Sequence, residues 1–116
     1  ERLNIPVVFG LTLGTDNNGN TIMPLKNSLH QNYPNPFNPT TTIPFDIVKT
    51  DQITLSVYNV KGEIVRTLLN SNLTPGSYEM RWDGRSDSGV ILSAGMYFIE
   101  LKGTSFRETS KMIYLK

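Results

Sequence analysis

The stretch that decides the fold is ITLSVYNVKGEIVRTLL, residues 53–69. Apolar and polar side chains alternate over residues 53–58, which is the two-residue period of a strand that buries one face. Residues 59–62, Asn-Val-Lys-Gly, then supply a turn, and a second strand-like run follows over residues 63–69. The sequence therefore predicts an antiparallel hairpin at this place.

The same alternation recurs on both sides of this hairpin. Further strands are expected at residues 42–48, 78–82, 97–102 and 106–115, and no window shows helical spacing over three turns. Pro44 cannot give a backbone N–H to a ladder, so we expect its strand at a sheet edge. Short strands separated by frequent turn signals predict an all-β fold, an immunoglobulin-like antiparallel β-sandwich of about seven strands.

The N-terminal part of the chain has a different character. Alternation over residues 7–13, a turn at 16–20 and a return at 22–25 predict a local hairpin. Three closely spaced prolines follow and favour an extended, stiff junction. We assign residues 1–29 to a linker or the tail of a preceding domain, in which a β-hairpin can form, and residues 30–116 to the folded domain.

Composition removes several classes of function. The chain has 116 residues, no cysteine, and 11 Lys and Arg against 10 Asp and Glu spread along its length. No electrostatic footprint for nucleic acid results, and disulfides, thiolate metal sites and cysteine nucleophiles are excluded. Apolar residues 5–13 form a stretch too short to cross a bilayer as a helix. Because the chain starts at Glu1 without a basic leader, we expect a fragment whose export signal lies upstream.

Catalytic residues in a recognisable arrangement are missing from the sequence. The single histidine, His30, lies in the proline-rich junction without an evident partner. Asp83 and Asp87 could perform acid/base chemistry in principle, but they lie in a glycine-rich polar loop where aspartates ordinarily cap turns. We therefore expect no enzymatic activity and no cofactor.

Two polar loops and a set of aromatic residues allow binding interpretations. Residues 83–89, with Asp83 and Asp87, and residues 16–20 present oxygen ligands at a spacing loosely like that of a calcium loop. Neither loop has a glycine at the sixth position or the distal bidentate glutamate that an EF-hand loop requires, so we favour structural turns. Aromatic residues at alternating strand positions could form a platform for sugar, although most are expected to fill the core. These residues are Tyr58, Tyr78, Trp82, Tyr97 and Tyr114.

A turn-rich string, YPNPFNPTTTI at residues 33–43, leads directly into the first strand of the folded domain. It resembles the opening motif of the C-terminal sorting domain of type A cargo proteins of the bacterial type IX secretion system. Residues 57–65 are similar to the second motif of that family, with its tight glycine turn. Residues 73–78 and 93–98 resemble the paired glycine and tyrosine turns of the family, and the segment from Gly103 to Lys116 resembles its closing motif.

The resemblance covers about residues 31–116 and includes several motifs in order. Residues 82–89 are also similar to the immunoglobulin-like part of flagellar hook-capping proteins, which supports the sandwich without deciding the function. The sorting-domain resemblance implies an address label at the C-terminus of a secreted enzyme or adhesin. An outer-membrane translocon would recognise it, and a sorting peptidase often cleaves such domains and attaches the cargo to surface lipopolysaccharide.

This resemblance also implies a place in the cell and a set of partners. The cargo would lie upstream in the same chain, cleavage would fall before Tyr33, and the protein would reach the cell surface or the medium through the periplasm and the outer membrane. The last strand, with Lys111 and Lys116, is expected at a sheet edge, where it could be read by a receptor or pair with a second copy. The same lysines could instead be edge charges that block aggregation.

The residues proposed for recognition come from the four motifs and the final strand. They are Tyr33, Pro34, Asn35, Pro36, Gly62, Gly76, Tyr78, Gly95, Tyr97, Lys111 and Lys116. An alternative of another class also fits the sequence: an immunoglobulin-like spacer, or a carbohydrate-binding or adhesion module attached to a secreted enzyme.

Overall fold

The hairpin expected at residues 53–69 forms one side of the larger sheet in a computed structural model that describes residues 14–15, 21–22 and 25–116. It consists of β5 (Asp51–Tyr58) and β6 (Ile64–Leu73), which pair antiparallel. β8 (Gly95–Lys102) pairs with the other edge of β5, and β9 (Arg107–Tyr114) pairs with β8. The four-stranded sheet therefore has the order β6-β5-β8-β9.

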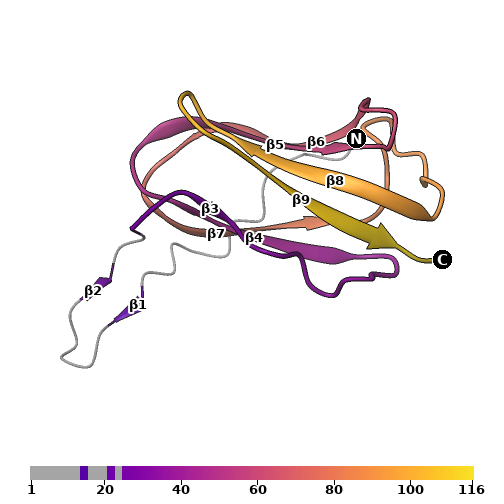
Figure 1. Ribbon diagram of the computed structural model, residues 1–116, viewed down its shortest axis with the longest axis horizontal. Helices are drawn as coiled ribbons and strands as arrows, with labels where there is room; N and C mark the ends of the chain where they lie inside the picture. The colour runs from indigo at the N-terminus through magenta and orange to yellow at the C-terminus, as the bar shows by residue number, and fades with distance from the viewer. Residues whose placement is uncertain (1–13, 16–20, 23–24) are drawn as a thin grey trace.

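The second sheet of the sandwich has three strands. They are β3 (Ser28–Leu29), β4 (Thr41–Ile47) and β7 (Gly76–Trp82), in the order β3-β4-β7 and all antiparallel. Figure 1 shows the two sheets stacked face to face. The predicted all-β sandwich of seven strands is confirmed. The described part of the chain contains no helix long and apolar enough to span a membrane.

A separate short ladder precedes the sandwich. β1 (Gly14–Thr15) pairs antiparallel with β2 (Thr21–Ile22). The remainder of the predicted N-terminal hairpin lies outside the described residues. β3 pairs with β4 although it falls just before residue 30, and the division of the chain at that point stays a prediction.

The core lies between the two sheets and follows the predicted alternation. Every second side chain of β4 is buried, and β5, β7 and β8 show the same pattern over most of their length. Tyr78, Trp82, Tyr97 and Tyr114 are all buried, so four of the five aromatic residues considered as a sugar platform fill the core instead. The other residues of the core are Phe37, Ile43, Phe45, Ile47, Ile53, Leu55, Val57, Leu68, Leu69, Leu73, Met80, Ile99, Leu101 and Met112.

The expectation that Pro44 marks an edge strand is wrong, because β4 lies between β3 and β7. The carbonyl of Pro44 accepts a hydrogen bond from the amide of His30 at 3.0 Å, so the backbone groups of Pro44 face the residues that precede β4. Backbone groups alternate in direction along a strand, and the missing N–H therefore costs the ladder with β7 nothing. A proline is tolerated in this central strand because its neighbour on that side is short and irregular.

Candidate functional site

The proline string, residues 33–40, connects the edges of the two sheets. Tyr33 and Thr42 exchange both backbone hydrogen bonds at 2.9 Å, which ties the start of the string to β4. Four residues later the amide of Phe37 donates to the carbonyl of Ile113 at 2.9 Å, and the carbonyl of Phe37 accepts from the amide of Leu115 at 2.8 Å. The string thus leaves one sheet and pairs, in parallel, with the end of β9 in the other.

Side chains close more of the outer edge of β9. The amide of Ile113 donates to Asn35 Oδ1 at 2.9 Å, and Gln31 Nε2 donates to the carbonyl of Lys111 at 3.2 Å. β9 is the edge strand of its sheet, but its last residues are covered by the proline string. Nothing in the sequence pattern announces this contact, since Asn35 and Ile113 are 78 positions apart.

Buried groups hold the proline string at both ends. The ring of Phe37 is 1% exposed and stacks on Tyr114, with centroids 4.9 Å apart and planes 7° from parallel. At the other end Asn32, also 1% exposed, donates from Nδ2 to Thr41 Oγ1 at 2.9 Å, and Thr41 Oγ1 donates to the carbonyl of Pro34 at 2.9 Å. The prolines of the string all follow cis peptide bonds.

Between these anchors the proline string is open to solvent. Pro34, Asn35 and Pro36 are exposed, and so is about half of Tyr33, whose hydroxyl donates to Glu79 Oε2 at 2.8 Å. That hydrogen bond is the main reason why the pKa of Tyr33 is raised, with partial burial and the negative charge of Glu79 adding to it. Tyr33 therefore presents a neutral hydroxyl group at physiological pH.

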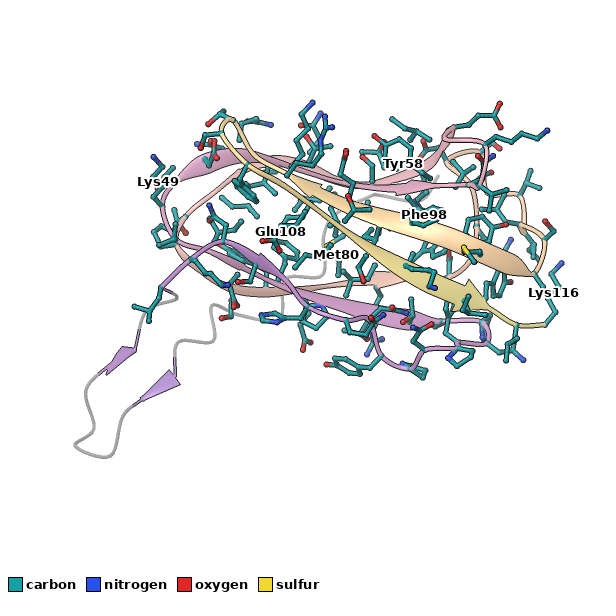
Figure 2. All side chains as sticks on the ribbon, in the orientation of Figure 1. Lys49, Tyr58, Met80, Phe98, Glu108 and Lys116 are labelled. Atoms are coloured by element: carbon teal, nitrogen blue, oxygen red, sulfur yellow. The ribbon has the colours of Figure 1, made fainter. Side chains whose placement is uncertain are left out.

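The C-terminal lysines adjoin the exposed part of the proline string. Lys111 and Lys116 are exposed, the first on β9 and the second directly after Leu115, whose amide is held by Phe37. Figure 2 shows Lys116 at one end of the sandwich, and in Figure 1 the string and the C-terminus lie at that same end. We name the exposed residues of this region the composite surface. It consists of Tyr33, Pro34, Asn35, Pro36, Lys111 and Lys116.

The two glycine and tyrosine turns have the same internal geometry. Tyr78 Oη donates to the carbonyl of Thr74, and Tyr97 Oη donates to the carbonyl of Ser93, both at 2.6 Å and both four residues upstream. This arrangement is the tyrosine corner of immunoglobulin-like sandwiches. Both tyrosines are nearly fully buried. We therefore interpret them as residues that fix the turns, rather than residues that a receptor could touch.

The three glycines proposed for recognition lie in turns at different places. Gly62 has φ +83°, a conformation that favours glycine, and closes the β5–β6 turn by donating to the carbonyl of Asn59 at 3.0 Å. Gly95 begins β8 and pairs with Tyr114, at the end of the sandwich where β9 ends. Gly76 begins β7 opposite Ile47, at the other end of β4 from the proline string. The structure thus unites the string with the lysines, and leaves Gly76 and Tyr78 apart from them.

Comparison with known proteins identifies the family of this sandwich. Residues 41–106 match the model of the FlgD Ig-like domain. The chain belongs to the FlgD Ig-like domain family. The immunoglobulin-like character predicted for the sandwich is thereby confirmed. No curated protein sequence matches the chain.

Three solved structures contain a region similar to this FlgD Ig-like domain. Dimeric latent PorU from Porphyromonas gingivalis has 19% identity and a TM-score of 0.59 over 75% of this chain and 9% of that one. PorZ, described as an essential surface component of the type-IX secretion system of the same bacterium, has 15% identity and a TM-score of 0.53 over 77% and 12%. FlgD from P. aeruginosa has 22% identity and a TM-score of 0.51 over 66% and 64%.

These likenesses establish the fold of the domain. The chain spans about a tenth of PorU and of PorZ, and less than two thirds of FlgD. A sandwich of similar fold therefore occurs as one small part of larger proteins, one of which is described as a surface component of the type-IX secretion system.

The tyrosine corners of the FlgD Ig-like domain give a first testable prediction. Tyr97→Phe and Tyr78→Phe each leave a backbone carbonyl without its tyrosine donor, and Tyr78→Phe also removes a contact with Thr74 Oγ1 at 3.3 Å, so each should lower the free energy of unfolding by about 1 kcal/mol or slightly more. Urea denaturation of the purified chain measures this. Tyr33→Phe is the control, because its hydroxyl lies at the surface and water can replace it. Equal losses in Tyr33→Phe and Tyr97→Phe would contradict the interpretation.

The aspartates considered for calcium bind a guanidinium group instead. Arg66, which is 7% exposed, places Nη1 3.7 Å from Asp83 Oδ1 and Nε 3.9 Å from Asp87 Oδ1. Asp87 Oδ1 also accepts the amide of Thr67 at 2.9 Å, which fastens the loop to β6. Among the residues that the structure describes, no group of three His, Cys, Asp or Glu could hold a metal ion. The second loop considered for calcium, residues 16–20, lies outside the described residues.

His30 belongs to a polar chain on the surface of the domain. Its Nε2 lies 2.8 Å from Asp46 Oδ2, and Ser77 Oγ donates to Asp46 Oδ1 at 2.7 Å. Activation of a serine requires the histidine between the serine and the aspartate, whereas here the aspartate lies between them. The arrangement therefore lacks the geometry of a nucleophile and its base. The absence of enzymatic activity stays a prediction.

Proposed function

We propose that the chain is a C-terminal sorting domain that directs an upstream cargo protein through the outer membrane by the type IX secretion system. The observation that carries the proposal is the composite surface. The opening motif and the closing motif of the resemblance are separated by most of the sequence, yet their exposed residues lie together because Phe37 and Asn35 bond to the end of β9. The likeness to a region of PorZ, a type-IX surface component, supports the proposal.

The composite surface has the physical properties that a receptor needs. Buried Asn32 and Phe37 anchor the proline string on both sides of its exposed residues. A segment held in this way loses little conformational entropy when it is bound, so more of the contact energy appears as affinity. Lys111 and Lys116 add two positive charges whose field would orient the domain toward an acidic receptor surface.

The proposal assigns partners and a location as well. The translocon would read the composite surface, and the sorting peptidase would cut before Tyr33, so that the cargo leaves without the sandwich. The protein would then be secreted or held at the cell surface. A spacer function, by contrast, would need the sandwich but not the exposed residues of the proline string.

The full-length parent protein, expressed in its own bacterium, provides the test. Removal of residues 30–116 should leave the cargo in the periplasm, and unchanged delivery to the surface would contradict the proposal. A pair of charge reversals tests the composite surface itself. Lys116→Glu and Lys49→Glu alter one exposed lysine each, at opposite ends of the sandwich in Figure 2.

We expect surface delivery of the cargo to fall several-fold in Lys116→Glu and to be unchanged in Lys49→Glu. Fractionation of periplasm, outer membrane and medium, followed by immunoblotting, measures both. Thermal unfolding of the purified variants controls for stability, which exposed lysines should alter by less than about 0.5 kcal/mol. Equal delivery by the two variants would show that the lysine near the proline string is not read.

A further inference from the structure

The solvent-facing side of the four-stranded sheet carries two aromatic residues, Tyr58 and Phe98, that the sorting proposal does not use. Tyr58 of β5 lies directly opposite Phe98 of β8 in the ladder, and Phe98 lies opposite Lys111 of β9. Residues directly opposite in an antiparallel pair have Cβ atoms about 5 Å apart, so the two side chains are neighbours on this face of the sheet. Both rings are partly exposed, and Figure 2 shows Tyr58 and Phe98 on neighbouring strands.

A carboxylate is fixed beside this pair of rings. Glu100 Oε1 accepts a hydrogen bond from the hydroxyl of Tyr58 at 3.0 Å, and Glu100 Oε2 lies 3.0 Å from Nε of Arg107. The Glu100 side chain is 14% exposed. Burial, the hydrogen bond to Glu100 and the charge of Glu100 raise the pKa of Tyr58, while Arg107 opposes the shift. The Tyr58 hydroxyl therefore stays protonated and keeps donating to Glu100.

Two hollows of the surface meet at the Tyr58 and Glu100 pair. One has a volume of about 400 Å³ and is lined by Phe98, Arg107 and Thr109, among others. The other has a volume of about 300 Å³ and is lined by Gln52 and Thr54. Tyr58 and Glu100 line both. We name these two adjoining hollows together the outer groove.

We propose that the outer groove binds a neutral, linear glycan chain. The proposal rests on three features together. Adjacent ring faces of Tyr58 and Phe98 can pack against the apolar C–H faces of sugar rings. Arg107 and Gln52 offer N–H donors, and Thr54 and Thr109 offer hydroxyl groups, which suit the vicinal hydroxyls of a sugar. The groove also follows β5 for several residues, which is long enough for more than one sugar unit.

The charges of the outer groove select a neutral ligand over a charged one. Glu100 and Arg107 neutralise each other at the centre of the groove, while Lys102 lines its other end. An anionic glycan would have to compete with the carboxylate of Glu100 for Arg107, whereas a neutral chain leaves this ion pair intact. The side chains of the groove contain too little contiguous apolar surface for an amphipathic helix, which needs a row of apolar pockets.

The residues that line this site are not those of the composite surface, although Lys111 of that surface lies opposite Phe98 in the ladder. The residues that would bind sugar here also differ from the five aromatic residues that the sequence suggested as a sugar platform. Of the five aromatic residues considered there, Tyr58 alone lines the outer groove, and Phe98 is its partner. Binding in vitro and surface delivery in cells are separate measurements, so either proposal can fail without the other.

The test titrates the full chain with four neutral hexasaccharides, cellohexaose, xylohexaose, laminarihexaose and maltohexaose, and with tri-galacturonate as the anionic comparison. Backbone amide shifts in NMR spectra locate binding, and isothermal titration gives the affinity. We expect at least one neutral sugar to shift the amides of Tyr58, Phe98 and Thr109 at millimolar concentration. Phe98→Ala should weaken that binding about tenfold or more, because it removes one of the two ring faces.

Glu100→Gln and Glu79→Gln form a matched pair of variants. Each carboxylate accepts a tyrosine hydroxyl, but Glu79 lies on β7 in the other sheet. Binding should weaken in Glu100→Gln and be unchanged in Glu79→Gln. Three results would each overturn the proposal: no neutral sugar shifts the groove amides, only tri-galacturonate does, or sedimentation shows that the sugar-free chain self-associates through this face.

Discussion

Trp82→Ala is expected to lower the free energy of unfolding by about 4 kcal/mol, which is the largest effect that we predict for a single substitution. The indole is 1% exposed and lies against Phe37, Tyr97 and Tyr114, with its ring centroid 5.4 to 6.3 Å from theirs. Its Nε1 donates to the carbonyl of Arg85 at 2.9 Å. Alanine would leave a cavity between the sheets and remove this hydrogen bond, so that the Arg85 carbonyl keeps only its longer one from Arg66 Nη1 at 3.3 Å, and both changes lower stability.

A domain of this size has about 5 to 15 kcal/mol of stability in total, so the variant should be partly unfolded near physiological temperature. Urea denaturation followed by circular dichroism measures the loss. Trp82→Phe keeps an aromatic ring and loses the hydrogen bond, so its loss should be clearly smaller. Val60→Ala, at an exposed turn position, should alter stability by less than about 0.5 kcal/mol. A Trp82→Ala loss no larger than that of Val60→Ala would contradict this account of the core.

The strands of the sandwich could be predicted from the sequence because they depend on the local alternation of apolar and polar side chains. The run at 53–58 has polar residues at every second position and glycine in the turn that follows, and the structure places β5 at Asp51–Tyr58. The last strand was expected at 106–115 and is found at Arg107–Tyr114. The sheet order was not accessible in the same way. Pro44 shows why, because an edge strand and a central strand beside a short neighbour tolerate the same missing N–H.

The candidate site depends on contacts between distant residues, which alternation does not report. The sequence pointed to the proline string and to the final lysines separately, and the resemblance grouped them as motifs. Only the structure shows that Asn35 caps the amide of Ile113. The same holds for the outer groove. Glu100 and Arg107 meet because of the exact pairing of β8 with β9, and predicted strand ends are not accurate enough to give that register.

The proline string also shows how one segment can be both structural and exposed. A free strand edge invites pairing with other chains, and natural sheets cover such edges or charge them. Here the string covers the end of β9, while Lys111 charges the adjoining part. The two interpretations of the lysines, as edge protection and as recognition, therefore apply to one surface. A substitution at a buried residue that anchors the string can show how far the string stabilises the fold and how far it serves recognition.

Phe37→Ala is that substitution, and we expect it to lower the free energy of unfolding by about 3 to 4 kcal/mol. The ring is fully buried against Tyr114 and Trp82, and its removal takes away the contact that holds the proline string on β9. The string should detach from β9 before the sandwich unfolds, because only the backbone bonds of residue 37 and the side chain of Asn35 would still hold it there. Amide hydrogen exchange measures this opening, and in the native chain the amides of Ile113 and Leu115 should be protected by the string.

Ile53→Ala is the control, since Ile53 is fully buried in β5 and its loss should cost a similar free energy without touching the string. In Phe37→Ala the exchange of Ile113 and Leu115 should accelerate far more than that of core amides such as Ile99. In Ile53→Ala all three should accelerate together, as expected when exchange follows global unfolding. The same exchange pattern in both variants would mean that the string has no opening of its own. If the sorting proposal holds as well, cargo delivery should fall further in Phe37→Ala than in Ile53→Ala, because only the former loses the arrangement of the composite surface.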